Sequence, residues 1–314
     1  MQIGLLEPSN FCIKAHATLA TLGVVRAWDG VDLRTFLAPL DALFVRLAHR
    51  IDGELLDWAP NLNWVCSPTT GHNHLDEQAF AARGIKVISL RGERAFLETI
   101  RATPEHTFGL VLALLRRYRD AFTETLAGSW DRDQFRGEEL CGNRVGIVGL
   151  GRVGYRVASY CAGFGAKVAW CDPADVVAEP DWMRLADVRT LIDASRIVVL
   201  CASFRNGHSP ILGKFEIERL AGRYLVNTAR GELVDEPALL AAIRADRLDG
   251  VATDVVVNEN GANRLDEWRE LASGRNLILT PHIGGATVDA MARTECFIAN
   301  KLAEEIARQS GRVA

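Results

Sequence analysis

The chain has 314 residues, of which 48% are hydrophobic and 24% are charged, and its formal net charge at pH 7 is -4. This length allows two domains with substantial cores, and the composition is that of an ordinary globular protein. A slight negative charge gives no reason to expect nucleic acid or an anionic membrane as a partner. We therefore expect neither a nucleic-acid partner nor a membrane partner.

The seven cysteines are odd in number and scattered, and no two form a Cys-x-x-Cys pair. This pattern favours reduced thiols in a cytoplasm over a disulfide framework, and it argues against a zinc ribbon. The N-terminus, Met1–Leu6, runs straight into an apolar segment and lacks the basic region of a signal peptide. The longest apolar run, Phe108–Leu115, is too short to span a bilayer. We expect a cytoplasmic protein without a bound metal.

Residues 1–90 alternate short apolar runs with helical patterns. Such alternation predicts a small parallel sheet with helices on both faces. The expected strands lie at 3–6, 23–27, 42–45, 64–67 and 86–88, and the expected helices lie near 10–20, 51–57 and 73–82.

The segment that follows predicts a helix with an unusual surface. Thr103 is the expected N-cap, and Pro104 suits the first helical position. The helix is apolar nearly all round as far as Leu115, and such a helix needs cover on every side. We expect it to be buried and to contribute to the interface of a homodimer, since twofold symmetry is the commonest arrangement.

A glycine-rich turn lies between two predicted strands. The apolar strand 145–148 runs into Gly-Leu-Gly-Arg-Val-Gly at 149–154, and a helix is expected to start by 155–162. A second apolar strand at 166–171 ends at Asp172. This order predicts a strand–helix–strand unit that binds a dinucleotide. The alternative, a plain glycine turn between strand and helix, does not explain the acid at position 172.

Each polar or small residue of this unit suits one part of a dinucleotide. Gly149 permits a tight turn, Gly151 lets the backbone approach a pyrophosphate, and Gly154 lets helix and strand pack closely. Asp172 would accept hydrogen bonds from ribose hydroxyls and would repel a 2′-phosphate, which favours NAD over NADP. The expected cofactor contacts here are Gly149, Gly151, Arg152, Val153, Gly154 and Asp172.

Further strands are expected at 197–201, 224–227, 251–255 and 277–279, before a final helix over 287–309. The last helix is expected to cross back to the first domain. The predicted fold is therefore α/β, with two doubly wound parallel-sheet domains. The cofactor domain, 103–285, would be inserted into a domain formed by 1–102 and 286–314.

Arg230 directly follows a predicted strand, and open α/β sheets bind ligands at the carboxyl ends of their strands. The planar guanidinium suits a carboxylate or an α-keto acid. On spacing alone, Arg230 could instead pair with Glu232 or Asp235.

Three more ionisable residues follow the next strands. Asp254 lies inside an apolar run, where a buried carboxylate needs partners. Glu259 lies just beyond it and, taken alone, could be a solvated loop acid. His282 follows a strand and a proline, and histidine is the usual proton donor or acceptor near neutral pH, although a lone histidine is more often structural.

Together these segments resemble the D-specific 2-hydroxyacid dehydrogenases, which include phosphoglycerate, glycerate/hydroxypyruvate and D-lactate dehydrogenases. The segment NTARGELVDE at 227–236 resembles the arginine motif of that family, and ATDVVVNEN at 252–260 resembles its aspartate-to-glutamate segment. LTPHIGG at 279–285 resembles its histidine motif, and residues 67–76 resemble its substrate loop.

The resemblance implies a Rossmann-like NAD domain, a flavodoxin-like substrate domain and an active site in the cleft between them. Hydride would pass between NAD and a small 2-oxo or 2-hydroxy acid. Arg230, Glu259 and His282 would be catalytic, with Arg230 binding the substrate and His282 acting as the acid/base paired to Glu259. The resemblance adds substrate contacts at Thr70, Gly71, Arg230 and His282, and cofactor contacts at Thr228, Ala229, Arg230, Asp254 and His282.

The chain departs from the family pattern at Thr253, at Asn260 and at Cys201-Ala202-Ser203. These positions lie close to cofactor or substrate in the family, so the sequence names neither the 2-hydroxy acid, the physiological direction nor the pathway. The chain ends at residue 314, and we expect no appended regulatory domain. Two other functions stay open: an NAD(H)-sensing binding protein like the transcriptional corepressors, and oxidation of formate or phosphite.

Overall fold

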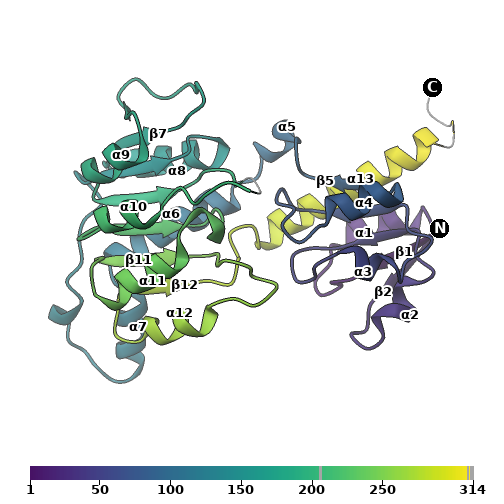
Figure 1. The fold of residues 1–314 in the computed structure, drawn as a ribbon, viewed down its shortest axis with the longest axis horizontal. Helices are drawn as coiled ribbons and strands as arrows, with labels where there is room; N and C mark the ends of the chain where they lie inside the picture. Colours follow the sequence, from purple (N-terminus) through teal and green to yellow (C-terminus); the bar gives the residue numbers. More distant parts are fainter. Residues whose placement is uncertain (205–206, 310, 312–314) are drawn as a thin grey trace. The chain divides into compact units, whose positions relative to one another are not determined.

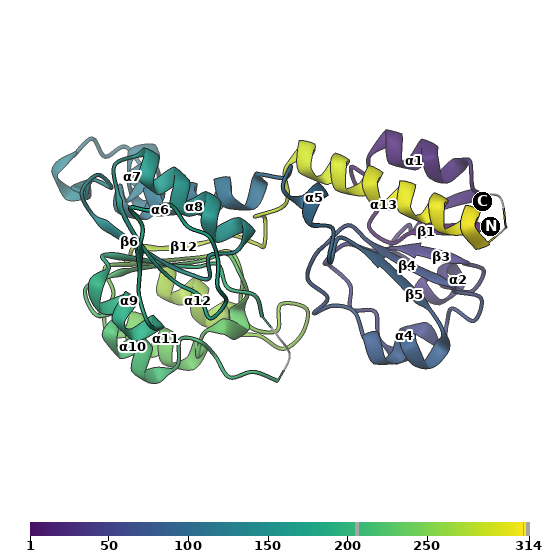
Figure 2. The same ribbon diagram turned by 90° about the horizontal axis from the view of Figure 1, so that it is seen from above.

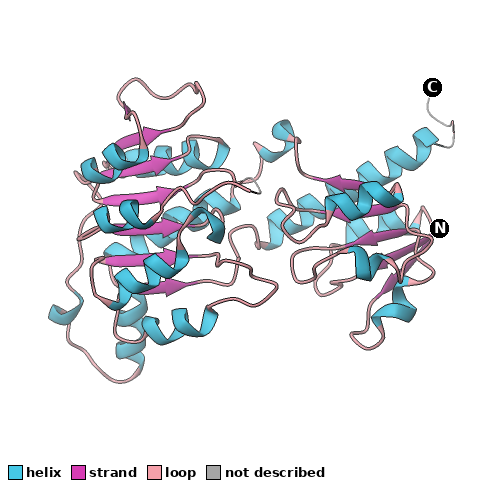
Figure 3. Cartoon of the chain, in the orientation of Figure 1, coloured by secondary structure: helices cyan, strands magenta, loops and turns pink. Residues whose placement is uncertain are grey.

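The computed structural model describes residues 1–204, 207–309 and 311, and the chain divides into two compact units. Unit 1 consists of Met1–Ile100 and Ala286–Ala314, and unit 2 consists of Arg101–Gly285. Residues 310 and 312–314, which belong to the expected first domain, lie outside the described residues. Each unit is a parallel sheet with helices on both faces, so the predicted fold class is confirmed (Figure 1, Figure 3).

Unit 1 contains a five-stranded parallel sheet in the order β2-β1-β3-β4-β5. The register places Ile3 opposite Val25 on one side and Ala42 on the other. All five strands coincide with the apolar runs that predicted them. The strands are β1 (Gln2–Leu5), β2 (Val24–Ala27), β3 (Ala42–Phe44), β4 (Trp64–Ser67) and β5 (Lys86–Ser89).

Two layers of helices cover this sheet (Figure 2). On one face lie α1 (Ile13–Ala20) and the long α13 (Val288–Gln309), so the two ends of the chain share a core. On the other face lie α2 (Leu33–Leu37), α3 (Gly53–Leu56) and α4 (Glu77–Arg83). A single turn, α5 (Arg94–Leu97), follows β5. The sequence did not predict α2 or α5, because each is too short to show a helical period.

Unit 2 contains a seven-stranded parallel sheet in the order β12-β11-β10-β9-β6-β7-β8. The first strand in the sequence, β6, lies inside the sheet. The next two strands, β7 and β8, lie on one side of it, and β9 to β12 follow in order on the other side. Only the two-residue edge strand β8 was not predicted. The strands are β6 (Arg144–Val148), β7 (Lys167–Cys171), β8 (Met183–Arg184), β9 (Ile197–Leu200), β10 (Tyr224–Asn227), β11 (Gly250–Thr253) and β12 (Leu277–Leu279).

The helices of unit 2 also form two layers (Figure 2). On one face of the sheet lie α6 (Ala102–Leu115) and α8 (Arg152–Gly163). The other face carries α9 (Val188–Ala194), α10 (Lys214–Arg219), α11 (Glu236–Arg244) and α12 (Leu265–Ala272). The remaining elements are α7 (Tyr118–Leu126) and the short 3-10 turns η1 (Asp133–Phe135) and η2 (Gly231–Leu233).

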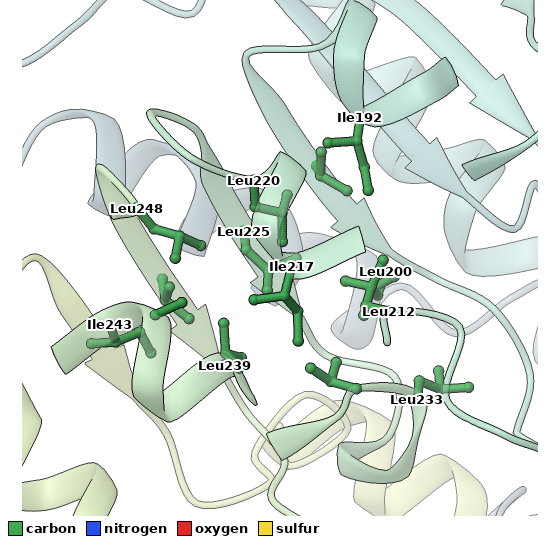
Figure 4. Packing of buried hydrophobic residues seen from close by; sticks show 14 of the residues in the cluster. Ile192, Leu200, Leu212, Ile217, Leu220, Leu225, Leu233, Leu239, Ile243 and Leu248 are labelled. Carbon is green, nitrogen blue, oxygen red and sulfur yellow. The ribbon is translucent and has the colours of Figure 1, made fainter. Parts of the chain in front are cut away.

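The largest hydrophobic cluster lies under the second of these layers (Figure 4). Leu200 and Leu225 from the strands pack against Ile192, Ile217 and Ile243 from three helices. Full burial of each such side chain contributes about 1.5–3 kcal/mol relative to exposure. This core makes the strands a rigid base for the loops that leave their carboxyl ends.

Helix α6 corrects one detail of the sequence prediction. It begins at Ala102 with Arg101 as N-cap, so Thr103 is not the cap. Thr103 instead lies within the first turn, and its carbonyl accepts a hydrogen bond of 2.7 Å from the Thr107 hydroxyl. Pro104 is tolerated there because amides of the first helical turn have no intrahelical acceptor. Packing within its own unit, against the sheet and α8, buries seven of its fourteen residues.

Among the residues that the structure describes, no helix combines the length and the apolar character needed to cross a bilayer.

Candidate cofactor and catalytic site

The cofactor and catalytic residues predicted in unit 2 all follow strands of one sheet. Gly149 follows β6 and Asp172 follows β7, while Thr228–Arg230 follow β10. Asp254 follows β11, and His282 comes shortly after β12. Because every pairing in this sheet is parallel, these residues lie along the same carboxyl edge. Ligands bind at this edge in open α/β sheets, next to the point where the strand order reverses.

The turn after β6 can be built only with glycine at two positions. Gly149 has a φ of +89°, and a Cβ there would lie 2.7 Å from the Cα of Ala202. A Cβ on Gly154 would collide with the carbonyl oxygen of Gly149, because α8 packs directly on the turn. The chain therefore turns from β6 into α8 with no side chain between them.

The start of α8 fits the phosphates and ribose of a dinucleotide. Gly151 is the N-cap, and a Cβ placed on it would meet no atom within 4 Å. The amides of Gly151 and Val153 donate to no acceptor in the part of the chain that the structure describes. Asp172 accepts the amides of Leu150 and Ala174, one on each oxygen at 2.8 Å, and retains lone pairs for ribose hydroxyls. Open space, free amides and a fixed carboxylate together match a dinucleotide site.

The loop that carries Arg230 is held by the last residue of β10. The Asn227 side chain donates to the Arg230 carbonyl at 2.9 Å and accepts the Ala229 amide at 3.0 Å. The guanidinium is half-buried, and this burial lowers the pKa of Arg230, although Glu259 and Glu232 oppose the change. A buried cation that is ready to receive an anion is the expected state of a carboxylate-binding arginine.

The alternative structural role for Arg230 is not observed. Within the described ranges, Arg230 forms no ion pair with Glu232 or Asp235, and its Nη1 donates to the Ala229 carbonyl at 2.6 Å. Asp235 instead caps α11 by accepting the Ala238 amide at 3.1 Å.

Thr228, next to Arg230, is anchored to α6. Its hydroxyl lies 2.6 Å from that of Thr107, and the Thr107 hydroxyl donates in turn to the carbonyl of Thr103. Thr107 is fully buried, and Thr228 is buried as well. The loop after β10 is thus fixed from both sides, by Asn227 and by α6.

Asp254 organises the turn that carries His282. This carboxylate is 1% exposed, and it accepts the Thr280 hydroxyl at 2.6 Å and the amides of Ile283 and Gly284 at 2.8 and 2.7 Å. Burial acts to raise the pKa of Asp254, but the hydrogen bonds from His106, Thr280 and these amides outweigh it, so the pKa is lowered. Asp254 is therefore a stable anion that supports the turn.

His282 adopts a conformation that this turn imposes. Its φ is +53°, in the left-handed region that few side-chain-bearing residues occupy. The His282 amide donates to the carbonyls of Asp254 at 2.9 Å and Thr280 at 3.0 Å. Such a conformation persists only where the surrounding structure enforces it, and here it fixes the direction of the imidazole.

His282 and Glu259 form a hydrogen-bonded pair. Nδ1 of the imidazole lies 2.6 Å from Oε2 of the glutamate, and both side chains remain partly exposed at 24% and 30%. Glu259 is therefore bound to His282 and is not simply a solvated loop acid. Because Nδ1 faces the carboxylate, Nε2 is the ring nitrogen that remains available to a second partner.

The loop between Asp254 and Glu259 packs against the loop of Arg230. A Cβ on Gly231 would collide with Val256, so the two loops approach as closely as backbone allows. Buried Glu236 accepts the Val257 amide at 3.2 Å, which ties the same loop to α11. Thr253, a departure from the family pattern, is buried, and its hydroxyl donates to the Val255 carbonyl at 2.5 Å. The hydroxyl that distinguishes Thr253 from the apolar residue of the family is thus hydrogen-bonded within its own loop.

In unit 1, the predicted substrate loop follows β4. The Thr69 hydroxyl donates to the Gly71 carbonyl at 3.0 Å, and His72 lies between Glu77 and the Ser89 hydroxyl. Within the described residues, the amides of Thr70 and Gly71 donate to no protein acceptor. Two adjacent free amides held in a fixed loop are suited to bind a carboxylate.

The sequence did not single out His106, Thr280 or Thr107, which support the site from behind. Nε2 of His106 lies 3.2 Å from the Thr280 hydroxyl and 3.4 Å from Asp254 Oδ1. No local pattern could reveal these partners, because each joins α6 to a strand end more than a hundred positions away. In the described part of the chain, no group of His, Cys, Asp and Glu could hold a metal ion.

Residues 108–284 match the family model described as the D-isomer specific 2-hydroxyacid dehydrogenase, NAD binding domain. This match extends over more than half of the chain. The chain belongs to the D-isomer specific 2-hydroxyacid dehydrogenase family. The resemblance noted from the sequence is thereby confirmed, and so is the prediction of NAD as the cofactor.

Two curated relatives illustrate the membership. A D-3-phosphoglycerate dehydrogenase of Mycobacterium leprae is 34% identical over 302 residues, covering 92% of this chain and 54% of the relative. A glyoxylate reductase of Thermofilum pendens is 32% identical over 270 residues, covering 83% of this chain and 77% of the relative. The chain thus spans about half the length of the phosphoglycerate dehydrogenases that it matches.

Among solved structures, a D-lactate dehydrogenase of Aquifex aeolicus, complexed with NAD and lactic acid, superposes with a TM-score of 0.82. It shares 23% identity and covers all of this chain. At this identity the likeness is one of fold, and it agrees with the two-sheet architecture.

Proposed function

We propose that this protein is an NAD-dependent D-2-hydroxyacid dehydrogenase that reduces small 2-oxo acids and oxidises the corresponding hydroxy acids. The observation that carries the proposal is the His282–Glu259 pair, at 2.6 Å, on the same sheet edge as Arg230 and the glycine turn. Family membership supports the chemistry, and the match to the NAD-binding domain supports the cofactor.

The cofactor, when bound, supplies or accepts the hydride. Its contacts would come from the turn at 149–154 and from Asp172, with Thr228–Arg230, Asp254 and His282 at the nicotinamide end. Arg230 would bind the substrate carboxylate and polarise the adjacent carbonyl through its paired N–H groups. Its guanidinium is half-buried and forms no ion pair with any of the described residues, so it is available for that task.

His282 would hold the proton that reduction requires, on Nε2. Nδ1 donates to Glu259, which fixes the orientation of the ring. As negative charge develops on the carbonyl oxygen, Nε2 gives up its proton, and in the reverse direction neutral Nε2 takes the proton back. The left-handed backbone of His282 and the anchoring of its turn by Asp254 would keep Nε2 in place.

Unit 1 would be the substrate domain. The free amides of Thr70 and Gly71 support a second contact to the substrate carboxylate, made by backbone groups without a charged side chain. The departures at Asn260 and at Cys201-Ala202-Ser203 leave the identity of the 2-oxo acid to experiment.

A reductase assay with NADH across glyoxylate, hydroxypyruvate, pyruvate, phenylpyruvate and phosphohydroxypyruvate would test the proposal. We expect saturable turnover of at least one of these acids, and a higher kcat/KM with NADH than with NADPH because of Asp172. NADH binding without turnover of any 2-oxo acid would instead support the NAD(H)-sensing alternative. A preference for NADPH would contradict the role given to Asp172.

We also propose that the protein is a homodimer whose interface includes α7 and the segment after it. Tyr118 and Phe122 stack with ring centroids 5.3 Å apart, and Phe122, Leu126 and Trp130 are 61%, 89% and 92% exposed. Large apolar side chains gathered in this way favour association. Seven of the fourteen residues of α6 are buried within unit 2, so its predicted contribution to the interface stays a proposal beside that of α7. Sedimentation should give a dimer, and Phe122→Glu should shift it toward monomer.

A cytoplasmic location is also proposed. It is supported by seven cysteines that are all free thiols, as expected of proteins from a reducing compartment. Cell fractionation of the tagged protein would test this location.

A further inference from the structure

Two cysteines that lie at opposite ends of the sequence meet in unit 1. The Sγ atoms of Cys12 and Cys296 are 3.5 Å apart, although 284 positions separate the two residues. Cys12 is the N-cap of α1, and Cys296 lies on α13, which packs beside α1. A disulfide bond is about 2.05 Å long, so bonding would require the sulfur atoms to move closer by roughly 1.5 Å.

The backbone around the pair is already fixed. The carboxylate of Glu295, which is 1% exposed, accepts the Cys12 amide at 2.7 Å and the Nε–H of Arg46 at 2.9 Å. The same arginine donates through another nitrogen to the Ser9 carbonyl at 2.9 Å. These contacts hold the start of α1 against α13, so the two sulfur atoms are kept close together before any bond forms.

The pKa values of the two thiols are shifted in opposite directions, which makes Cys12 the first sulfur to react. Burial and the Glu295 carboxylate act to raise the pKa of Cys12, but the backbone N–H groups of Ala15 and Lys14 and the Cys296 thiol outweigh them and lower the pKa. Burial raises the pKa of Cys296 to about 11. A position at a helix N-terminus is one of the environments that lower the pKa of a cysteine and make it reactive. Cys161, by contrast, is fully buried, and burial raises its pKa to about 12.

We propose that Cys12 and Cys296 form a reversible intramolecular disulfide when the protein meets a hydroperoxide. The Cys12 thiolate attacks one peroxide oxygen and breaks the O–O bond, which gives a sulfenic acid on Cys12 and releases hydroxide that is protonated to water. The Cys296 sulfur then attacks the Cys12 sulfur, forms the S–S bond, and displaces a second hydroxide that leaves as water with the thiol proton. The two thiols lose two electrons, and hydrogen peroxide is reduced to two molecules of water.

The bond would close a covalent ring that contains all of unit 2, because that unit lies between the two cysteines in the sequence. It would also join the loop after β1 to α13, within the unit that carries the Thr70–Gly71 loop. Cross-links that close long loops restrict the unfolded chain most. Oxidation is therefore expected to raise the melting temperature.

Peptide mapping of the purified full chain tests the proposal. The protein is treated with hydrogen peroxide, blocked with N-ethylmaleimide, digested and analysed by mass spectrometry, with and without dithiothreitol before blocking. We expect a linked pair of peptides containing Cys12 and Cys296, two hydrogens lighter than their sum, and its loss after dithiothreitol. Recovery of both cysteines as alkylated peptides, or of Cys12 as a sulfinic acid without a link, would overturn the proposal.

Three variants sharpen the result. The exposed thiol is removed in Cys141→Ser, which should keep the linked peptides and the rise in melting temperature on oxidation. Cys296→Ser should lose both. Persistence of the rise in Cys296→Ser would assign it to another thiol and contradict the proposal. Cys12→Ser should lose the link as well, and if that variant fails to fold, mapping of the wild-type chain still decides the question. These readouts do not depend on catalytic activity, so they stay informative whatever the substrate.

Discussion

The two units have related topologies but differ in the crevice where the strand order reverses. In unit 1 the reversal lies between β1 and β3, and in unit 2 it lies between β6 and β9. In unit 1, Glu7 after β1 accepts the amides of Arg46 and Ala48 after β3, at 3.1 and 3.2 Å. That crevice is bridged by a side chain of the protein itself.

In unit 2 the corresponding positions after β6 are glycines. Gly149 packs against Ala202 after β9, and Gly151 faces open space beside free amides at the start of α8. The same kind of sheet therefore either closes its crevice with a carboxylate or leaves room there for a ligand. Topology supplies the crevice, and the residues at the strand ends decide whether it can bind a cofactor.

The largest effect is expected from the proton donor at the edge of unit 2. His282→Gln keeps a polar side chain but cannot supply a proton near neutral pH, so kcat should fall by about 10²–10⁴-fold in both directions. NADH affinity, measured by fluorescence titration, should change little. His16→Gln, at an exposed position of unit 1, is the matched control. If His282→Gln retained most of the activity, His282 would not be the acid/base.

A somewhat smaller loss is expected from Arg230→Lys. Lysine keeps the charge but not the two parallel N–H donors that match a carboxylate. Loss of such an interaction costs about 2–4 kcal/mol of transition-state binding, or roughly 30- to 1000-fold in kcat/KM. If steady-state kinetics show kcat/KM near that of the wild type, Arg230 has a structural role instead.

The contrast between the crevices can be tested with one substitution in each. Gly149→Ala places a Cβ against Ala202 and keeps a strained backbone, which costs on the order of 1–3 kcal/mol, so NADH binding should weaken about tenfold or more. Glu7→Ala frees two amides in unit 1 and should lower the melting temperature while leaving the NADH dissociation constant unchanged. Equal losses of NADH affinity in the two variants would refute the contrast.

The smallest effect is expected from the partner of His282. Glu259→Gln keeps the size of the side chain and a hydrogen bond to Nδ1 but removes its charge, so kcat should fall by less than in His282→Gln. Steady-state kinetics in both directions measure this loss. An unchanged kcat in both directions would mean that the charge of Glu259 has no part in catalysis.

Sequence patterns located nearly all the strands because each is a short apolar run that ends at a turn residue or an acid. The glycine turn and Asp172 were predictable for the same reason, since both lie within one strand–helix–strand unit. The predicted start of α6 was wrong, because a proline such as Pro104 fits any position of the first helical turn and does not mark the first one. Contacts such as His106 with Thr280, or Cys12 with Cys296, join distant segments, and no local pattern encodes them.

The central claim is that hydride passes from the cofactor to the 2-carbon of an oxo acid at the edge of unit 2. Transfer of deuterium from NADH that carries deuterium in place of both hydrogens at C4 of the nicotinamide tests this most directly, with the product examined by NMR and chiral chromatography. We predict deuterium at C2 of a D-2-hydroxy acid, which His282→Gln should form about 10²–10⁴-fold more slowly. An unlabelled product, or an L-hydroxy acid, would contradict it.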